Sequence, residues 1–280
     1  MKVGIVGNGF VGKATKILEC KDIEIKAYDI NPDLCHPLGL KLSDMKECDV
    51  IFVSVPTPMS KDGSVYTGIV QNVLNDLKQI QFQNFIVIRS TVPPGTCDNL
   101  NCYFMPEFLT EKNFLEDFKN NPLWIFGVLN KSKDTLFKKT ITQIINLAHK
   151  NKCIYSNNIK FMLNKEAEMV KYFRNTFLSV KVGYCNEIYE YCQKKNINYE
   201  NVRKVAASDK RIGLSHTSVP GHDGKFGFGG TCFPKDTNGL LSDMKKHNIK
   251  SYILESVLQR NEEVDRPEKD WNNNKGRAVI

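Results

Sequence analysis

The chain has 280 residues, of which 41% are hydrophobic and 25% charged, with a net charge of +8. These proportions exclude a disordered or fibrous protein and predict two medium-sized domains, each with its own core. The lysines occur as scattered pairs rather than in a tract, which favours an anionic small-molecule substrate over nucleic acid. Apolar runs are all too short to span a membrane, so we expect no membrane partner.

The nine cysteines are odd in number and contain no CxxC spacing. They therefore indicate neither a disulfide framework nor a zinc site, and we expect no bound metal. The first residues lead directly into an apolar run without the layout of a signal peptide. Together these features predict a cytoplasmic protein with reduced thiols.

A glycine turn follows the first predicted strand. The strand covers residues 1–6, a helix is predicted over 13–19, and Gly7, Gly9 and Gly12 lie between them in the pattern GxGxxG. The first glycine permits a tight turn, the second lets a pyrophosphate approach the backbone, and the third lets the helix pack on the strand. The arrangement predicts a dinucleotide-binding site.

An acidic residue after the second strand selects the dinucleotide. The strand covers residues 23–28 and ends at Asp29, whose carboxylate can hydrogen-bond both hydroxyls of an adenosine ribose. The same charge would repel a 2′-phosphate, so we expect NAD rather than NADP. Phe10 and Val11, inside the glycine turn, are expected to contact the cofactor as well.

The alternation of strand and helix continues to about residue 157. Residues 49–55 are almost all apolar, as in a parallel strand that is buried on both faces, and Thr57 follows at its carboxyl end. Further strands are predicted at 85–89, 124–129 and 153–155, with helices at 68–79 and 132–149. This pattern predicts an α/β fold in which residues 1–157 form a doubly wound parallel sheet of the Rossmann type.

From about residue 158 the pattern becomes helical. A proline-free segment at 164–195 is too long and too apolar for a surface helix, so we expect it to bridge domains or pair with itself in a homodimer. Shorter helices are predicted near 200–206, 236–247 and 252–264. We therefore expect a smaller all-helical domain over residues 158–265, followed by a polar tail at 266–280.

A cysteine in the second half has the surroundings of a nucleophile. Cys232 lies between a glycine-rich stretch at 226–230 and the step Pro234-Lys235-Asp236, which is typical of the start of a helix. The positive end of a helix favours the thiolate, although a purely structural loop is the alternative interpretation. A nucleophilic thiol beside NAD indicates a four-electron oxidation, in which an aldehyde becomes a thiohemiacetal, then a thioester, and finally an acid.

Six motifs along the chain resemble those of the UDP-glucose/GDP-mannose dehydrogenase family. They are GxGxxG at 7–12, STVPPGT at 90–96, PEFL at 106–109, KxxxN at 171–175, RIG at 211–213 and GFGGxCFPKD at 227–236. The resemblance implies an NAD-dependent, four-electron oxidation of the C6 alcohol of a UDP-hexose, with UDP-glucose giving UDP-glucuronate.

The resemblance also implies a catalytic role for six residues. Cys232 would be the nucleophile, Lys171 would steady the developing alkoxide and oxyanion, and Asn175 would donate to the same oxygen. Asp236 would handle protons or position water together with Lys171, and Glu107 would act as the base in thioester hydrolysis. Thr91 would hold water or cofactor near the reacting carbon. How proton transfer divides among Lys171, Asp236 and Glu107 stays open.

Other positions match family residues that contact ligands. The cofactor contacts would include Thr57, Thr91, Glu111 and Lys235. The sugar-nucleotide contacts would be Glu107, Phe108, Leu109, Lys171, Asn175, Gly221, Lys225 and Gly229.

Members of the family add a third domain that grips the nucleotide diphosphate, and this sequence ends at Ile280 without it. The expectation is that the first two domains and a dimer mate hold the nucleotide, that a separate chain supplies the missing part, or that the substrate differs. Two alternatives stay open on sequence alone. One is a single-hydride β-hydroxy acid dehydrogenase, and the other is a non-catalytic NAD-binding module that needs a partner chain.

Overall fold

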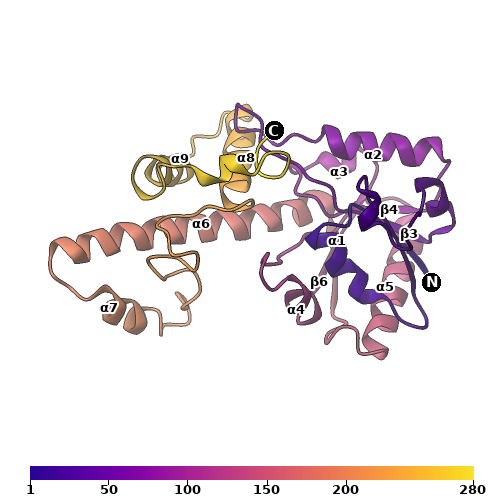
Figure 1. The fold of residues 1–280 in the computed structure, drawn as a ribbon, viewed down its shortest axis with the longest axis horizontal. Coiled ribbons are helices and arrows are strands. Elements are labelled where there is room, and N and C mark those ends of the chain that lie inside the picture. Colours follow the sequence, from indigo (N-terminus) through magenta and orange to yellow (C-terminus); the bar gives the residue numbers. More distant parts are fainter. The chain divides into compact units, whose positions relative to one another are not determined.

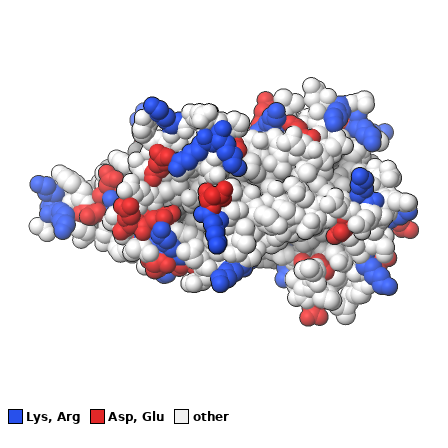
Figure 2. Space-filling model, turned by 90° about the horizontal axis from the view of Figure 1, so that it is seen from above, with Lys and Arg blue, Asp and Glu red and all other residues white.

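The computed structural model describes residues 1–280, which divide into two compact units (Figure 1). The first unit contains Met1–Thr57 and Thr67–Lys171, and the second contains Pro58–Tyr66 and Tyr172–Ile280. None of the helices combines the length and the apolar character that crossing a membrane requires. On the face drawn in Figure 2, basic and acidic side chains lie interspersed, in keeping with the scattered lysine pairs of the sequence.

A seven-stranded sheet forms the centre of the first unit, in the order β2-β1-β3-β4-β5-β6-β7. Its strands are β1 (Lys2–Val6), β2 (Glu24–Tyr28), β3 (Val50–Val53), β4 (Phe85–Ile88), β5 (Tyr103–Phe104), β6 (Trp124–Val128) and β7 (Ile159–Leu163). Strands β1 to β5 pair in parallel, whereas β6 is antiparallel to β5 and parallel to β7. The sheet is thus mostly parallel, with a reversal at β6.

Helices cover both faces of this sheet. They are α1 (Phe10–Thr15), α2 (Gly68–Gln79), α3 (Thr96–Asn99), α4 (Phe114–Lys119) and α5 (Asp134–Lys150), with 3₁₀ turns at Lys16–Leu18, Pro32–Leu34 and Leu42–Glu47. Alternate residues of β3 enter different hydrophobic clusters, Phe52 with Phe137 of α5 and Ile51 with Leu77 of α2. Because successive side chains of a strand point to opposite faces, both faces are buried. The predicted doubly wound fold is confirmed.

The second unit is helical. It contains most of α6 (Asn164–Lys194), together with α7 (Tyr199–Ala206), α8 (Phe233–Lys246), α9 (Tyr252–Arg260), a π-helical turn at Asn261–Asp265 and a 3₁₀ turn at Asp270–Asn273. The short segment Pro58–Tyr66 belongs to this unit, where the backbone N–H of Met59 donates to the carbonyl of Ala278 at 2.8 Å. The polar tail predicted at 266–280 carries a 3₁₀ turn and a buried residue, Trp271.

Two predictions about strands are wrong. Residues 153–155 form a bend rather than a strand, and the last strand of the sheet is β7, beyond the point where the strand signal was expected to stop. Strand β7 runs without a break into α6, so no turn residues separate the two patterns. The chain passes from the first unit to the second within α6, and the functional boundary after residue 157 stays a prediction.

Candidate functional site

The glycine turn of the first unit has the predicted geometry. Gly7 has a φ of +90°, and a Cβ there would lie 2.7 Å from the carbonyl oxygen of Ser54. A Cβ on Gly12 would overlap the carbonyl oxygen of Gly7, whereas a Cβ on Gly9 would meet no atom within 4 Å. The fold therefore requires glycine at the first and third positions, and the second leaves open space for a ligand group.

Asp29 is held in place directly after β2. Its Oδ2 accepts the backbone N–H of Asn8 at 2.6 Å, and its Oδ1 accepts that of Asn31 at 2.9 Å. Each carboxylate oxygen has a second lone pair for a ribose hydroxyl. Phe10 packs edge-to-face on Phe114 at 6.2 Å, and the carbonyl of Val11 accepts from the hydroxyl of its helix neighbour Thr15. The turn and this carboxylate fit NAD.

The loops after β3 and β4 carry the two predicted threonines. Thr57 and Thr91 are both buried, and the Ser90 hydroxyl links their loops by donating to the carbonyl of Val55 at 2.6 Å. Ligands of doubly wound folds bind outside the carboxyl ends of the strands, where both loops lie. Glu111 lies exposed in the loop before α4.

Glu168 was missed by sequence reasoning, although it precedes Lys171 by one helical turn. Its carboxylate accepts the backbone N–H of Gly95 at 2.5 Å and that of Cys97 at 2.8 Å, and its side chain is fully buried. Burial raises the pKa of the Glu168 carboxyl above its ordinary value, while the two backbone donors oppose this shift. The residue fixes the STVPPGT turn from within α6.

A buried ion pair joins two predicted catalytic residues of the first unit. Lys171 Nζ lies 2.6 Å from Glu107 Oε1 and donates to the Glu107 carbonyl at 2.9 Å, and the two side chains are 4% and 7% exposed. The second carboxylate oxygen accepts the N–H of Leu109 at 2.9 Å, and the ammonium lies 5.9 Å from the ring centre of Phe108. Desolvating two charges is costly, so a pair of this kind favours a functional role over a structural one.

Cys232 lies at the start of α8 in the second unit. It is the N-cap residue, it is partly exposed, and Pro234 occupies the first turn as predicted. Gly227 and Gly230 precede it with φ values of +63° and +71°, which residues with a Cβ rarely adopt. The structure therefore places this thiol at the positive end of a 14-residue helix, behind a glycine loop.

Three other predicted residues meet one turn into α8. Asp236 is fully buried, and its Oδ2 accepts from Asn175 Nδ2 while its Oδ1 accepts from Lys235 Nζ, both at 2.6 Å. Lys235, predicted to contact the cofactor, thus pairs with the neighbouring carboxylate. Lys171 precedes Asn175 by one turn of α6.

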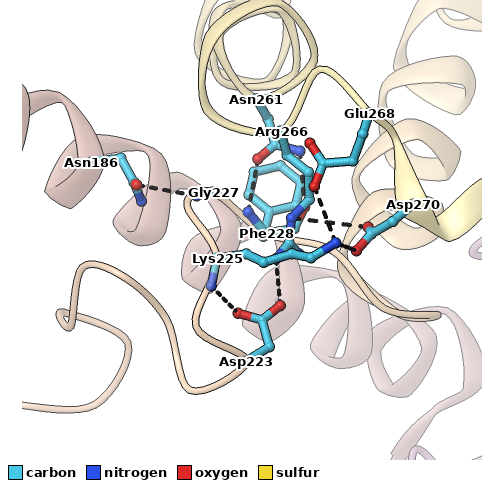
Figure 3. A network of polar contacts seen from close by, with 9 residues as sticks. All are labelled: Asn186, Asp223, Lys225, Gly227, Phe228, Asn261, Arg266, Glu268 and Asp270. Atoms are coloured by element: carbon cyan, nitrogen blue, oxygen red, sulfur yellow. Dashed lines mark hydrogen bonds and ion pairs between the residues drawn. The ribbon is translucent and has the colours of Figure 1, made fainter.

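The residues of the second unit that were predicted to bind the sugar nucleotide lie in the glycine loop, residues 227–230, and in the segment before it. The N–H of Gly221 donates to the carbonyl of Lys225 at 2.8 Å, closing a turn. The Lys225 ammonium lies 3.1 Å from a Glu268 oxygen and 2.8 Å from an Asp270 oxygen (Figure 3). A Cβ on Gly229 would overlap a guanidinium nitrogen, and sequence reasoning missed the residues that surround this loop: Asn186, Asn261 and Arg266.

Curated relatives and a solved structure resemble the chain over most of its length. The UDP-glucose 6-dehydrogenase of Campylobacter jejuni is 32% identical over 301 residues, covering 94% of this chain and 72% of the relative. That of Rickettsia prowazekii is 30% identical, covering 89% of this chain, which spans 57% of that relative's length. The structure of a UDP-glucose dehydrogenase from Pyrobaculum islandicum has a TM-score of 0.78 at 24% identity, covering 93% of this chain and 68% of the other, which shows the shared fold.

Two domains of one protein family match successive parts of the chain. Residues 40–145 match the NAD binding domain of the UDP-glucose/GDP-mannose dehydrogenase family, and residues 165–263 match its central domain. The predicted cofactor, NAD, is confirmed by the first match. With a 32% identical relative covered over 72% of its length as well, the chain belongs to the UDP-glucose/GDP-mannose dehydrogenase family.

Proposed function

We propose that this chain oxidises the C6 alcohol of UDP-glucose to the carboxylate of UDP-glucuronate, with Cys232 as the covalent nucleophile. The observation that carries the proposal is the partly exposed thiol at the N-terminus of α8, followed one turn later by the buried Asp236 with Asn175 and Lys235. A β-hydroxy acid dehydrogenase, which transfers one hydride, has no need of such a thiol. The names of the curated relatives support the same substrate.

The oxidation proceeds through two two-electron steps. NAD, when bound, supplies the hydride acceptor, one molecule for each step. After the alcohol has become an aldehyde, the Cys232 thiolate adds to its carbon, and the resulting oxyanion is protonated to a thiohemiacetal. The side chains assigned to this oxygen are Lys171 and Asn175, which donate hydrogen bonds to it.

The second oxidation converts the thiohemiacetal to a thioester, which water then hydrolyses. Glu107 accepts a proton from the attacking water, the carbon–sulfur bond breaks, and the thiolate of Cys232 is restored. The buried contact of 2.6 Å between Glu107 Oε1 and Lys171 Nζ holds the carboxylate and the ammonium side by side. In sum, one alcohol and one water give a carboxylate, with two hydrides transferred and three protons released.

The yield of NADH from limiting substrate tests this function. We expect two NADH per UDP-glucose, and none from GDP-mannose or UDP-N-acetylmannosamine. One NADH per substrate would indicate a single-hydride enzyme. No NADH from any sugar nucleotide, with NAD binding intact, would overturn the stand-alone activity and favour a binding module that needs a partner chain.

We also propose that the chain forms a homodimer through α6. The second-unit part of this helix carries four aromatic residues with 57–64% of their surface exposed, namely Phe173, Phe177, Tyr184 and Tyr191. Their spacing keeps them on one stripe of the helix, and burying that stripe against a second copy would remove it from water. We expect Phe177→Lys to give a monomer in light scattering. Leu136→Lys, at an equally exposed position of α5, should stay dimeric.

A cytoplasmic location is proposed on the ground of the cysteines. The structure forms no disulfide among the nine, as expected of thiols kept under reducing conditions. Alkylation of freshly lysed cells should modify all nine after denaturation without reductant. Disulfide-linked peptides among them would contradict this location.

A further inference from the structure

Side chains from distant segments hold the glycine loop, residues 227–230, that leads to the nucleophile. The backbone N–H of Gly227 donates to Asn186 Oδ1 at 3.1 Å. The N–H of Phe228 donates to Asn261 Oδ1 at 2.8 Å, and the carbonyl of Phe228 accepts from Asn261 Nδ2 at 2.9 Å. Figure 3 shows these side chains converging on the loop from α6 and from the segment after α9.

The double contact of Asn261 suits an amide and few other groups. Both backbone polar groups of Phe228 are satisfied by one side chain, and Asn261 is 1% exposed. An amide offers one acceptor and one donor side by side, whereas an ionised carboxylate offers acceptors only. The two hydrogen bonds therefore fix the backbone conformation at Phe228, in addition to the packing that the Asn261 side chain provides.

A π-helical turn brings a second side chain to the loop. Asn261–Asp265 form this turn, closed by the N–H of Arg266 donating to the carbonyl of Asn261 at 2.7 Å. Such turns are rare and frequent at functional sites. The Arg266 guanidinium, also buried, pairs with Asp223 and lies where a Cβ on Gly229 would be. Segment 261–266 and the glycine loop are thus complementary in shape and hydrogen bonding.

We propose that Asn261 is a positioning residue for the oxidation: it fixes the backbone of Phe228, and through the glycines that follow it sets the position of the Cys232 sulfur. The proposal rests on the nucleophilic role proposed above for that thiol. Both of these hydrogen bonds go to the backbone of Phe228, four residues before Cys232, so the effect of Asn261 passes through the loop.

The first test compares two buried asparagines. Asn261→Ala removes both bonds to Phe228, whereas Asn164→Ala removes two bonds, to Asp98 and to the carbonyl of Cys102, in the first unit. We expect Asn261→Ala to lower kcat for UDP-glucose about 10- to 100-fold, the cost of misplacing a reacting group. The KM of this variant for NAD should stay within about twofold of the wild-type value, because the substitution leaves the glycine turn at 7–12 and Asp29 unchanged.

Thiol reactivity gives a readout that does not depend on turnover. Limited iodoacetamide labelling and peptide mass spectrometry would report the labelling of Cys232 relative to Cys20, which is partly buried in the first unit. We expect this ratio to change about fivefold or more in Asn261→Ala, as reactivity follows the local environment of the thiol. Asn164→Ala should lower the melting temperature and leave the ratio unchanged.

Asn261→Asp provides a rescue by pH. A protonated carboxyl offers one acceptor and one donor, as the amide does, whereas the ionised form places an oxygen against the Phe228 carbonyl. Relative to the wild type at each pH, we therefore expect this variant to label and turn over poorly at pH 8 and to recover toward pH 5.

The outcomes separate the two proposals. A wild type that yields no NADH refutes the proposed function, while the labelling ratios still test Asn261. Unchanged labelling and kcat in Asn261→Ala, a matching change in Asn164→Ala, or no pH-dependent recovery in Asn261→Asp would each overturn the positioning role.

Discussion

Two glycine turns precede helices in this protein, one at 7–12 and one at 227–230. The atoms that leave no room for a Cβ differ between them. In the first unit the obstacle is backbone: the carbonyl of Gly7 stands where a Cβ on Gly12 would be. In the second unit the obstacles are side chains, Asn261 beside Gly227 and Arg266 beside Gly229. The first turn is therefore constrained by main-chain groups, Gly7 itself and Ser54, whereas the second is constrained by the side chains of a distant segment.

The largest effect is expected from Gly12→Ala. Because a carbonyl of the same turn blocks the new methyl group, the backbone itself must move. We expect the free energy of unfolding to fall by about 3 kcal/mol, the upper end for overpacking, and NAD binding to be lost. Denaturant unfolding and calorimetric titration with NAD would measure both. A stable variant that still binds NAD would contradict the backbone explanation.

A smaller loss of stability, which a second substitution should relieve, is expected from Gly229→Ala. Here the obstacle is the end of a flexible side chain, so we expect a loss of about 2 kcal/mol. Adding Arg266→Ala should relieve the overlap, giving a favourable coupling energy of about 1 kcal/mol or more in the double-mutant cycle. The control is Gly230→Ala, where a Cβ meets nothing within 4 Å and only the positive φ is strained. Gly230→Ala should show no coupling energy with Arg266→Ala. If the losses of unfolding free energy from Gly229→Ala and Arg266→Ala were additive, the two residues would not share a contact.

The smallest effect on stability is expected from Gly9→Ala. A Cβ there has open space and an ordinary φ, so the free energy of unfolding should change by less than about 0.5 kcal/mol. NAD should nevertheless bind more weakly, since the methyl group would lie where the pyrophosphate approaches. Equal affinity of the variant and the wild type would show that the cofactor does not use this turn as proposed.

Local patterns in the sequence were sufficient for much of the fold and part of the site. The strand, glycine turn, helix and Asp29 lie within 29 residues, and Cys232, Lys235 and Asp236 are almost contiguous, so short-range rules identify them. The strand β7 was missed because it joins α6 directly, without turn residues. The antiparallel pairing of β6 was missed for a related reason, since hydrophobic pattern does not encode strand direction.

The supporting residues were out of reach for a different reason. Glu168 binds backbone N–H groups more than 70 positions away, and Asn261 binds Phe228 across 33. Their partners are main-chain groups, which every residue carries. The residue types of the two segments therefore do not indicate that the segments are in contact. Supporting side chains of this kind can be identified only from the folded structure.

The most direct test of the account is the Cys232→Ser variant, assayed for NADH with limiting UDP-glucose beside the wild type, with a hydrazide present to trap aldehyde. Serine preserves the shape of the site, but its hydroxyl lacks the nucleophilicity of a thiolate. We predict two NADH per sugar from the wild type. The variant should form at most one, with the C6 aldehyde recovered as its hydrazone. Two NADH per sugar from Cys232→Ser at the wild-type rate would contradict the covalent mechanism.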